Sequence, residues 1–284
     1  AAKPILTIMG TPDDVLTLAA TYLRIYFLGI PFFLIFNFGA AILRSMGDTK
    51  RPLYILVIAG IVNTVLNLFF VIVLKMSVAG VAVATGIANL VSALLIIRLL
   101  CKEKAPFRLH LNKIGVVWSE LKRMLMIGIP AGLQGMVFSF SNVLLQTAIN
   151  GYGSDAIAGS AAALNFEYYC YFVIAAFNGA AISFIGQNYG AGNKERVKRI
   201  YWICLTLSVV CCGALNELFV WQRHFFLSFF SNDPNVQTYG ATRMGIVLAW
   251  QFIASSYEIS ASSLRGMGRS MLPTILTVFG TCLL

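Results

Sequence analysis

Charged residues are scarce in this chain of 284 residues. Asp, Glu, Lys and Arg make up 11% of it, whereas about 25% is usual for a soluble globular domain. So few charges cannot cover a surface that faces water. An apolar fraction of 58% and a mean hydropathy of +0.80 instead favour a membrane protein. The net charge of +10 then indicates basic loops beside anionic lipid, and not a surface that binds nucleic acid.

Signatures of catalysis and of metal binding are also missing. The sequence contains no H-E-x-x-H, no G-x-S-x-G and no phosphate loop of the form G-x-x-x-x-G-K-[ST]. Its six cysteines show no C-x-x-C spacing, and five lie in apolar stretches, where reduced cysteine acts as a small hydrophobic residue. We therefore expect neither an enzyme nor a metal site, and no bound cofactor.

Long apolar runs alternate with short basic segments along the chain. Each run has about 20 residues, the length of a membrane-spanning helix, whereas a barrel strand shows only about ten residues of alternating polarity. The pattern predicts an all-α polytopic membrane protein with seven complete spans and a cut eighth that begins near Met271. The seven runs cover 19–43, 53–74, 78–100, 124–150, 156–186, 200–221 and 241–264.

Lys and Arg divide unevenly between the two sides of these spans. When successive loops are assigned to alternate sides, 16 of the 21 basic residues fall on one side. The positive-inside rule makes that side cytoplasmic, for a multi-pass protein of the cell inner (plasma) membrane. The basic segment 101–123 lies on this side and is predicted to connect two helical bundles, 1–100 and 124–284.

The chain also contains an internal repeat at an offset of 221 residues. Segment 43–47 (L-R-S-M-G) matches segment 264–268 (L-R-G-M-G), and the match continues upstream without a gap through the preceding span. The offset crosses six spans, so the two copies have the same orientation and form parallel repeats. The repeat predicts about three further spans before residue 1 and about 40–50 residues after residue 284, giving two pseudo-symmetric six-helix lobes, both truncated here.

Four motifs in register with this repeat resemble those of the MATE (multidrug and toxic compound extrusion) family. They are L-R-S-M-G-D-T-K-R-P at 43–52, G-I-P at 128–130, G-Q-N-Y-G-A-G-N at 186–193 and L-R-G-M-G at 264–268. The resemblance covers essentially the whole chain. It implies two six-helix lobes around a central cavity, and an antiporter that exports organic, often cationic, compounds in exchange for H⁺ or Na⁺. We expect a monomer surrounded by membrane lipid, with small organic molecules as its substrates.

Glutamates inside the predicted spans are the first candidates for function, because an acidic residue such as Asp costs about 2.5–3.5 kcal/mol at the centre of a membrane helix. Glu258 lies at helical spacing from Gln251, Ser255 and Ser262, which predicts one polar face. Such a carboxylate is typical of a group that exchanges a proton or contacts a cationic substrate. An interhelical hydrogen bond is the alternative.

Glu167 has a similar setting in another predicted span. It stands one turn before Tyr171 and on the same side as Asn178, and aromatic neighbours suit a cavity for organic cations. An interhelical hydrogen bond is again the alternative. Glu217 lies close to a span end beside Trp221, a pattern typical of an interfacial residue.

Two amides and two prolines complete the candidates. Gln134 and Asn142 follow Pro130, where the resemblance implies that a cavity-lining helix begins. Pro31 and Pro130 lie inside predicted spans, and each is interpreted either as a bending point or as a fixed kink.

One position departs from the pattern of the family. The resemblance implies that Na⁺-coupled members carry a glutamate eight residues after the proline of the seventh span, and Phe138 stands there in this chain. The acid of their tenth span would fall near Ala254, one turn before Glu258. The coupling ion is therefore left open between H⁺ and Na⁺. The spans contain almost no Lys or Arg, which favours cationic or neutral cargo; a lipid-linked saccharide flippase of the same superfamily is the alternative.

Overall fold

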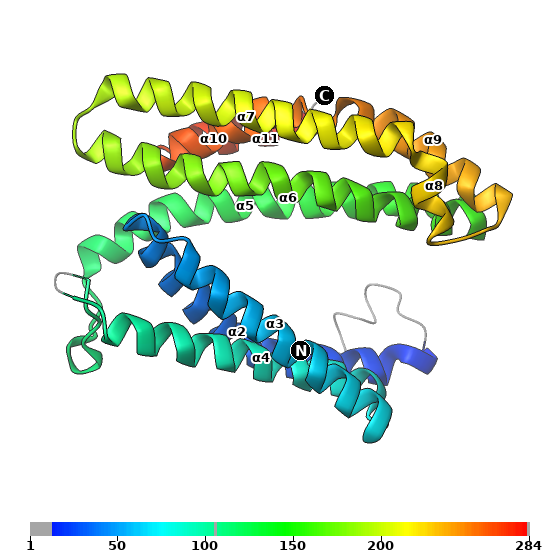
Figure 1. Ribbon diagram of the computed structural model, residues 1–284, viewed down its shortest axis with the longest axis horizontal. Helices are drawn as coiled ribbons and strands as arrows, with labels where there is room; N and C mark the ends of the chain where they lie inside the picture. The colour runs from blue at the N-terminus through cyan, green and yellow to red at the C-terminus, as the bar shows by residue number, and fades with distance from the viewer. Residues whose placement is uncertain (1–12, 105–106, 283–284) are drawn as a thin grey trace. The chain divides into compact units, whose positions relative to one another are not determined.

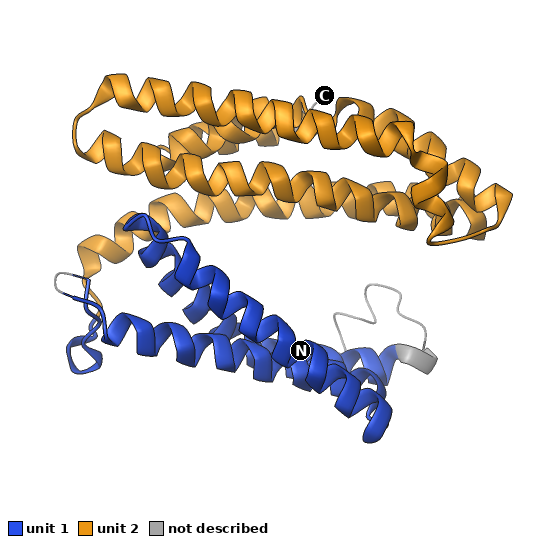
Figure 2. Ribbon diagram, viewed as in Figure 1, with its two compact units in different colours: residues 1–115 blue, residues 116–284 orange. Residues whose placement is uncertain are grey.

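The computed structural model describes residues 13–104 and 107–282, which are helical and contain no strand (Figure 1). This confirms the predicted all-α class. The chain forms two compact units, residues 1–115 and residues 116–284 (Figure 2). The predicted connector at 101–123 overlaps helices at both ends, because one helix ends at Cys101 and the next begins at Trp118. The assignment of the ranges to two lobes stays a prediction.

The described part of unit 1 contains three long helices. They are α2 (Asp13–Ser45), α3 (Lys50–Leu68), which is extended by the π-helical turn η1 (Phe69–Val73), and α4 (Ser77–Cys101). Helix α4 packs along both α2 and α3, and its Ile96 and Leu100 form a buried cluster with Phe36 and Leu43 of α2. A short 3₁₀ helix, η2 (Leu111–Lys113), lies near the end of the unit.

The turn between α2 and α3 is held by Asp48. Its carboxylate accepts hydrogen bonds from the backbone N–H groups of Lys50 at 3.1 Å and Arg51 at 3.2 Å, and also contacts the Arg51 guanidinium. Arg51 Nη1 in turn donates to Glu103 Oε2 at 2.6 Å, which ties the turn to the segment after α4. Burial acts to raise the pKa of Asp48, but the hydrogen bonds and charge of Arg51 outweigh it and hold this pKa below its ordinary value.

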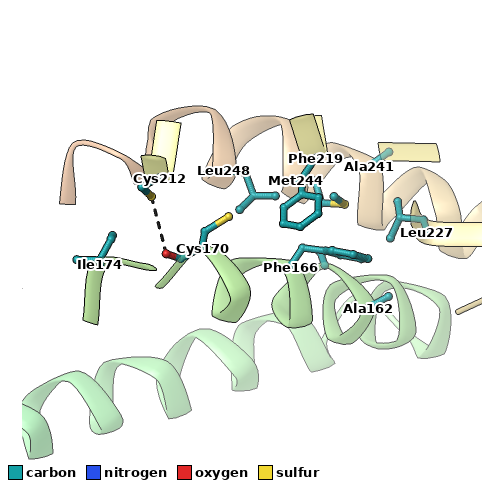
Figure 3. Close-up of a cluster of buried hydrophobic side chains, with 11 residues drawn as sticks. Ala162, Phe166, Cys170, Ile174, Cys212, Phe219, Leu227, Ala241, Met244 and Leu248 are labelled. Carbon is teal, nitrogen blue, oxygen red and sulfur yellow. Dashed lines mark hydrogen bonds between the residues drawn. The ribbon is translucent and has the colours of Figure 1, made fainter. Parts of the chain in front are cut away.

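Unit 2 is organised around one long helix, α6. Its elements are α5 (Trp118–Asn150), α6 (Ser154–Gly190), α7 (Lys194–Trp221), α8 (Arg223–Ser228), α9 (Pro234–Gln251), α10 (Ala254–Gly266) and α11 (Met271–Cys282). Helix α6 packs against α7, α9 and α10. Figure 3 shows the resulting core, in which Phe166, Cys170 and Ile174 of α6 lie beside Cys212 of α7 and Leu248 of α9.

Six helices in the described residues are long and apolar enough to cross a membrane. They match the first six predicted spans, and the eighth predicted run forms α11. The predicted seventh span, 241–264, is wrong as a continuous helix, because the helix is interrupted at 252–253, between the end of α9 and the start of α10. Around the break the N–H of Ile253 donates to Trp250 O, and the N–H of Ser256 donates to Ile253 O. These tight bonds to the third residue back interrupt the α-helical ladder.

The element boundaries repeat at the offset found in the sequence. Helix α2 covers 13–45 while α9 and α10 together cover 234–266, and α3 and α11 begin at Lys50 and Met271. Gly47 and Gly268 end the two copies with φ angles of +84° and +79°. Both copies therefore carry the same turn after the same length of chain, which supports a duplication. The two copies differ at one place, because α2 continues through Pro31 where the second copy is broken.

Two glycine contacts bring α6 close to its neighbours. A Cβ atom added at Gly159 would lie 2.4 Å from Val236 O and 2.8 Å from Gly240 N of α9. One added at Gly266 of α10 would lie 2.9 Å from Ile182 O of α6. Small residues at such crossings let membrane helices pack backbone to backbone. The backbones of α6, α9 and α10 therefore approach each other only because these positions have no side chain.

This packing predicts opposite outcomes for two glycines of the same helix. Gly159→Ala should lower the free energy of unfolding by about 1–3 kcal/mol, the usual cost of overpacking, because backbone atoms cannot move aside as a side chain can. Gly179→Ala is the matched control, since nothing lies within 4 Å of an added Cβ there, and alanine is the better helix former. Thermal unfolding of the full chain in detergent, followed by circular dichroism, measures both. Equal melting temperatures for the two variants would contradict the close approach.

Candidate functional site

Unit 2 contains a cavity of about 500 Å³ between α5, α6, α9 and α10. This volume lies within the usual range of small-molecule sites. Its wall combines aromatic rings with a few charged and amide groups. The polar and aromatic lining residues are Phe138, Asn142 and Gln146 of α5, Glu167, Tyr168 and Tyr171 of α6, Arg243 and Gln251 of α9, and Tyr257 and Glu258 of α10.

Glu258 is held at this cavity by two hydrogen-bond donors. Asn178 Nδ2 of α6 donates to Glu258 Oε2 at 2.9 Å, and the hydroxyl of the neighbouring Tyr257 donates to Oε1 at 2.8 Å. The side chain is buried, with 8% of the residue's surface exposed. No ion pair within the described residues involves Glu258. The carboxylate is thus oriented by neutral donors, and no cationic side chain pairs with it.

Glu167, the second carboxylate of the cavity, has a cationic partner. Arg243 of α9 donates through Nε to Glu167 Oε1 at 2.6 Å and through Nη2 to Oε2 at 3.1 Å. This two-point contact is the strong, directional form of an arginine–carboxylate pair. Gln251 Nε2 donates to the backbone carbonyl of Glu167 at 3.0 Å. The carboxylate and the backbone carbonyl of Glu167 therefore both bind side chains of α9.

Sequence reasoning overlooked Arg243. In the division of Lys and Arg between the two sides of the membrane, Arg243 belongs to the side with fewer basic residues. The missed signal was its position inside the predicted span 241–264, where a charged residue is itself a candidate for function. Its partner lies 76 residues earlier in the chain.

The structure places Glu167, Tyr171 and Asn178 on one face of α6, and their role in binding stays a prediction. Glu167 and Tyr171 both line the cavity, and Asn178 reaches Glu258. Asn178 follows Glu167 by 11 residues, a helical spacing that returns to the same face about 16 Å further along the axis. Aromatic side chains also line the cavity, including Phe138 and Tyr257, whose ring centroids are 6.3 Å apart.

The polar face predicted around Glu258 is divided between two helices. Gln251 ends α9 before the break and contacts Glu167, while Ser255 and Glu258 lie on α10. Ser255 does not line the cavity, because it is fully buried against α7 and its Oγ accepts a hydrogen bond from Ser208 Oγ at 3.1 Å. Ser262 is also buried on α10. Gln251 and Glu258 nevertheless line the same cavity, because residues 252 and 253 keep helical backbone angles through the 3₁₀ turn.

Of the two candidate amides on α5, one lines the cavity and the other does not. Asn142 lines the cavity. Gln134 does not, because its Nε2 donates to Thr277 Oγ1 of α11 at 2.9 Å and its Oε1 accepts from the guanidinium of Arg265 of α10. Gln134 therefore acts as a contact between helices. Glu217 is exposed on α7 and is not among the residues that line the cavity.

Phe138 and the two prolines occupy distinct settings. Phe138 lines the cavity, so an aromatic ring stands where the resemblance implied an acid in Na⁺-coupled relatives. Pro31 is exposed and Pro130 is buried, and both lie inside uninterrupted helices. Their role as bending points stays a prediction.

Comparisons with known proteins identify the family. The family model described as MatE matches residues 1–69 and 130–284. The chain is 35% identical over 195 residues to the probable multidrug resistance protein YpnP of Bacillus subtilis, covering 68% of this chain and 43% of that protein. It is 26% identical over 283 residues to the FAD transporter of Shewanella oneidensis, covering 92% of this chain and 61% of that protein. The chain thus spans only part of the length of both relatives.

A solved structure has the same fold. It is the outward-facing conformation of a multidrug resistance MATE family transporter of the MOP superfamily, and it superposes with a TM-score of 0.91 at 22% sequence identity. The superposition covers 100% of this chain and 64% of that structure. Because the family model matches most of the sequence and the helices follow the same fold, the chain belongs to the MatE family of integral membrane transporters.

Proposed function

We propose that the protein carrying this chain is a secondary antiporter, and not an enzyme, that exports small organic cations. The observation that carries the proposal is Glu258, a buried carboxylate at the cavity with neutral donors and no cationic partner within the described residues. An unpaired negative charge in a site of low polarity attracts a cation strongly. The aromatic rings of Tyr168, Tyr171 and Tyr257 add cation–π attraction and an apolar surface for the cargo.

The same carboxylate supports coupling to an ion gradient. If Glu258 takes up a proton, its charge disappears and its attraction for a cationic substrate is lost with it. A sodium ion bound to the carboxylate would compensate the same charge. Substrate and coupling ion thus compete for Glu258, which is the requirement for exchange. The proposal needs no cofactor other than H⁺ or Na⁺.

Anionic cargo is the alternative that the comparisons raise, since one relative bears the name FAD transporter, and a lipid-linked saccharide carries phosphate too. Such cargo would require an unpaired cation at the site. Arg243 is the cation among the lining residues, and both of its contacts with Glu167 are already formed. The charge of the cavity therefore supports cationic cargo over a phosphate-bearing one.

We further propose a monomer in the plasma membrane, surrounded by lipid, with its basic loops in the cytoplasm. The support is the uneven division of Lys and Arg between the loops. Alternating access would need helices that bend. The break at 252–253, beside the cavity residues Gln251 and Tyr257, is a bending point in addition to the predicted Pro31 and Pro130.

Sidedness predicts which positions a membrane-impermeant thiol reagent reaches. In a background without the native cysteines, single cysteines at Lys104 and Lys198 should be labelled only from the cytoplasmic side. Cysteines at Asp155 and Asp233 should be labelled only from outside. Labelling of intact cells against inverted vesicles measures this. Reaction of the positions at Lys198 and Asp155 from the same side would refute the proposed topology.

Replacement of Glu258 separates a coupling role from a packing role. Glu258→Gln in the full-length protein should abolish ion-driven export, because the amide accepts a hydrogen bond but cannot carry the charge. Membrane insertion should be unimpaired, since an amide costs less than a charge in the bilayer. Glu258→Leu should lose export as well and also lower stability, because it leaves Asn178 Nδ2 without its acceptor.

The assay is drug uptake into inverted vesicles under an imposed H⁺ or Na⁺ gradient, at matched expression. Glu217→Gln is the matched control, because Glu217 is exposed outside the cavity, and it should transport normally. Near-normal export by the Glu258→Gln variant would reduce Glu258 to a packing residue and overturn the proposal.

A further inference from the structure

The cavity of unit 2 contains one more ionic feature than the proposed exchange uses. The Glu167–Arg243 pair lines the same cavity as Glu258 but lies at the other end of the polar face of α6. With both carboxylates ionised, the lining carries two negative charges and the one positive charge of Arg243. Counted over the lining residues, the cavity therefore has a net charge of one negative unit, located at Glu258; the guanidinium of Arg265, which contacts Gln134, stands outside this lining.

We propose that Arg243 determines the charge class of the cargo, selecting organic monocations over dications by cancelling Glu167. This inference deepens the proposed function and rests on it. A guanidinium suits the role because it stays protonated at every physiological pH. The pair is also well shielded, with side-chain exposures of 15% for Arg243 and 11% for Glu167, so water screens it little.

The spacing of the two carboxylate sites also determines which length of dication would fit the cavity. Glu167 and Asn178, the residue that holds Glu258, are about 16 Å apart along α6. The surface between them is aromatic, with Tyr168 and Tyr171 among its residues. A carboxylate left unpaired at Glu167 would form a second cation site at the far end of this surface. An elongated molecule with a cationic group at each end could then bind both carboxylates, whereas the wild-type cavity offers one unpaired carboxylate to a monocation.

The pair is not the sole link between α6 and α9, so its removal is expected to leave the fold intact. The two helices also share the glycine contact of Gly159 with Gly240 and a buried core that includes Phe166 and Met244. Gln251 Nε2 additionally binds the backbone carbonyl of Glu167, a contact independent of the carboxylate.

Two probes that share a ten-carbon alkyl chain test the inference. Decamethonium has a trimethylammonium group at each end of a ten-carbon chain, and decyltrimethylammonium has only one. Their equilibrium binding is measured on the full-length protein in nonionic detergent, for wild type, Arg243→Gln, Glu167→Gln and the double variant. Arg243→Gln should bind decamethonium at least about tenfold more tightly than wild type, because a buried carboxylate loses its counter-charge. Binding of decyltrimethylammonium should change far less.

The charge-neutral double variant is the matched control. It lacks both side chains of the pair but restores the net charge of the cavity, so its preference between the probes should return to that of wild type. Glu167→Gln alone leaves Arg243 unpaired and should weaken both probes, decamethonium the more. This variant tests the inference in the opposite direction and keeps it testable if Arg243→Gln fails to fold.

The outcomes separate this inference from the proposed function. If Glu258→Gln leaves decyltrimethylammonium binding unchanged, the proposed function fails. If Glu258→Gln abolishes that binding but Arg243→Gln and Glu167→Gln leave the ratio of the two affinities as in wild type, the proposed function stands. In that case the charge-selecting role of Arg243 is overturned, and the pair only joins α6 to α9.

Discussion

Lipid offers no hydrogen bonds, so a polar side chain at membrane depth gains from a partner inside the protein. In unit 2 helix α6 supplies such partners at the cavity. It presents Glu167 to Arg243 of α9 and Asn178 to Glu258 of α10, on one face. The face can serve both neighbours because glycines let their backbones approach α6 closely. The cavity, its charge and the proposed chemistry all follow from this helix.

The two carboxylates of the cavity, Glu167 and Glu258, have different surroundings. Glu167 forms an ion pair with two contacts, whereas the donors to Glu258 within the described residues are an amide and a phenol. A paired charge inside a protein is compensated and contributes mainly to structure and specificity. An unpaired one retains its attraction for a mobile cation. The division of roles between a charge-selecting pair and an exchanging carboxylate thus arises from which neighbour each glutamate meets.

The sequence predicted the helices well and the site in part, for physical reasons. Hydropathy reports burial in lipid over about 20 residues, so six spans could be read directly. The offset of 221 residues appeared again in helix boundaries and in the turns at Gly47 and Gly268. The stripe Glu167–Tyr171–Asn178 was predicted correctly because α6 is continuous and helical spacing holds along all of it.

The remaining features depend on contacts between distant segments. The break at 252–253 contains neither proline nor glycine, so nothing local marked it, and the expected face around Glu258 fell on two helices. Gln134 forms hydrogen bonds with Thr277 and Arg265, which lie more than 130 residues later in the chain. Spacing within one helix cannot indicate which neighbouring helix will meet a polar group. Pairings between helices therefore had to come from the structure.

The central claim is that an organic cation binds in the cavity of unit 2 beside Glu258. The most direct test is an experimental structure of the full-length protein with tetraphenylarsonium, a monocation whose arsenic atom can be located by anomalous scattering. The account predicts an arsenic peak within the cavity, between the aromatic rings of Tyr171 and Tyr257 and next to the Glu258 carboxylate. A peak on the lipid-facing surface, with the cavity free of arsenic, would contradict it.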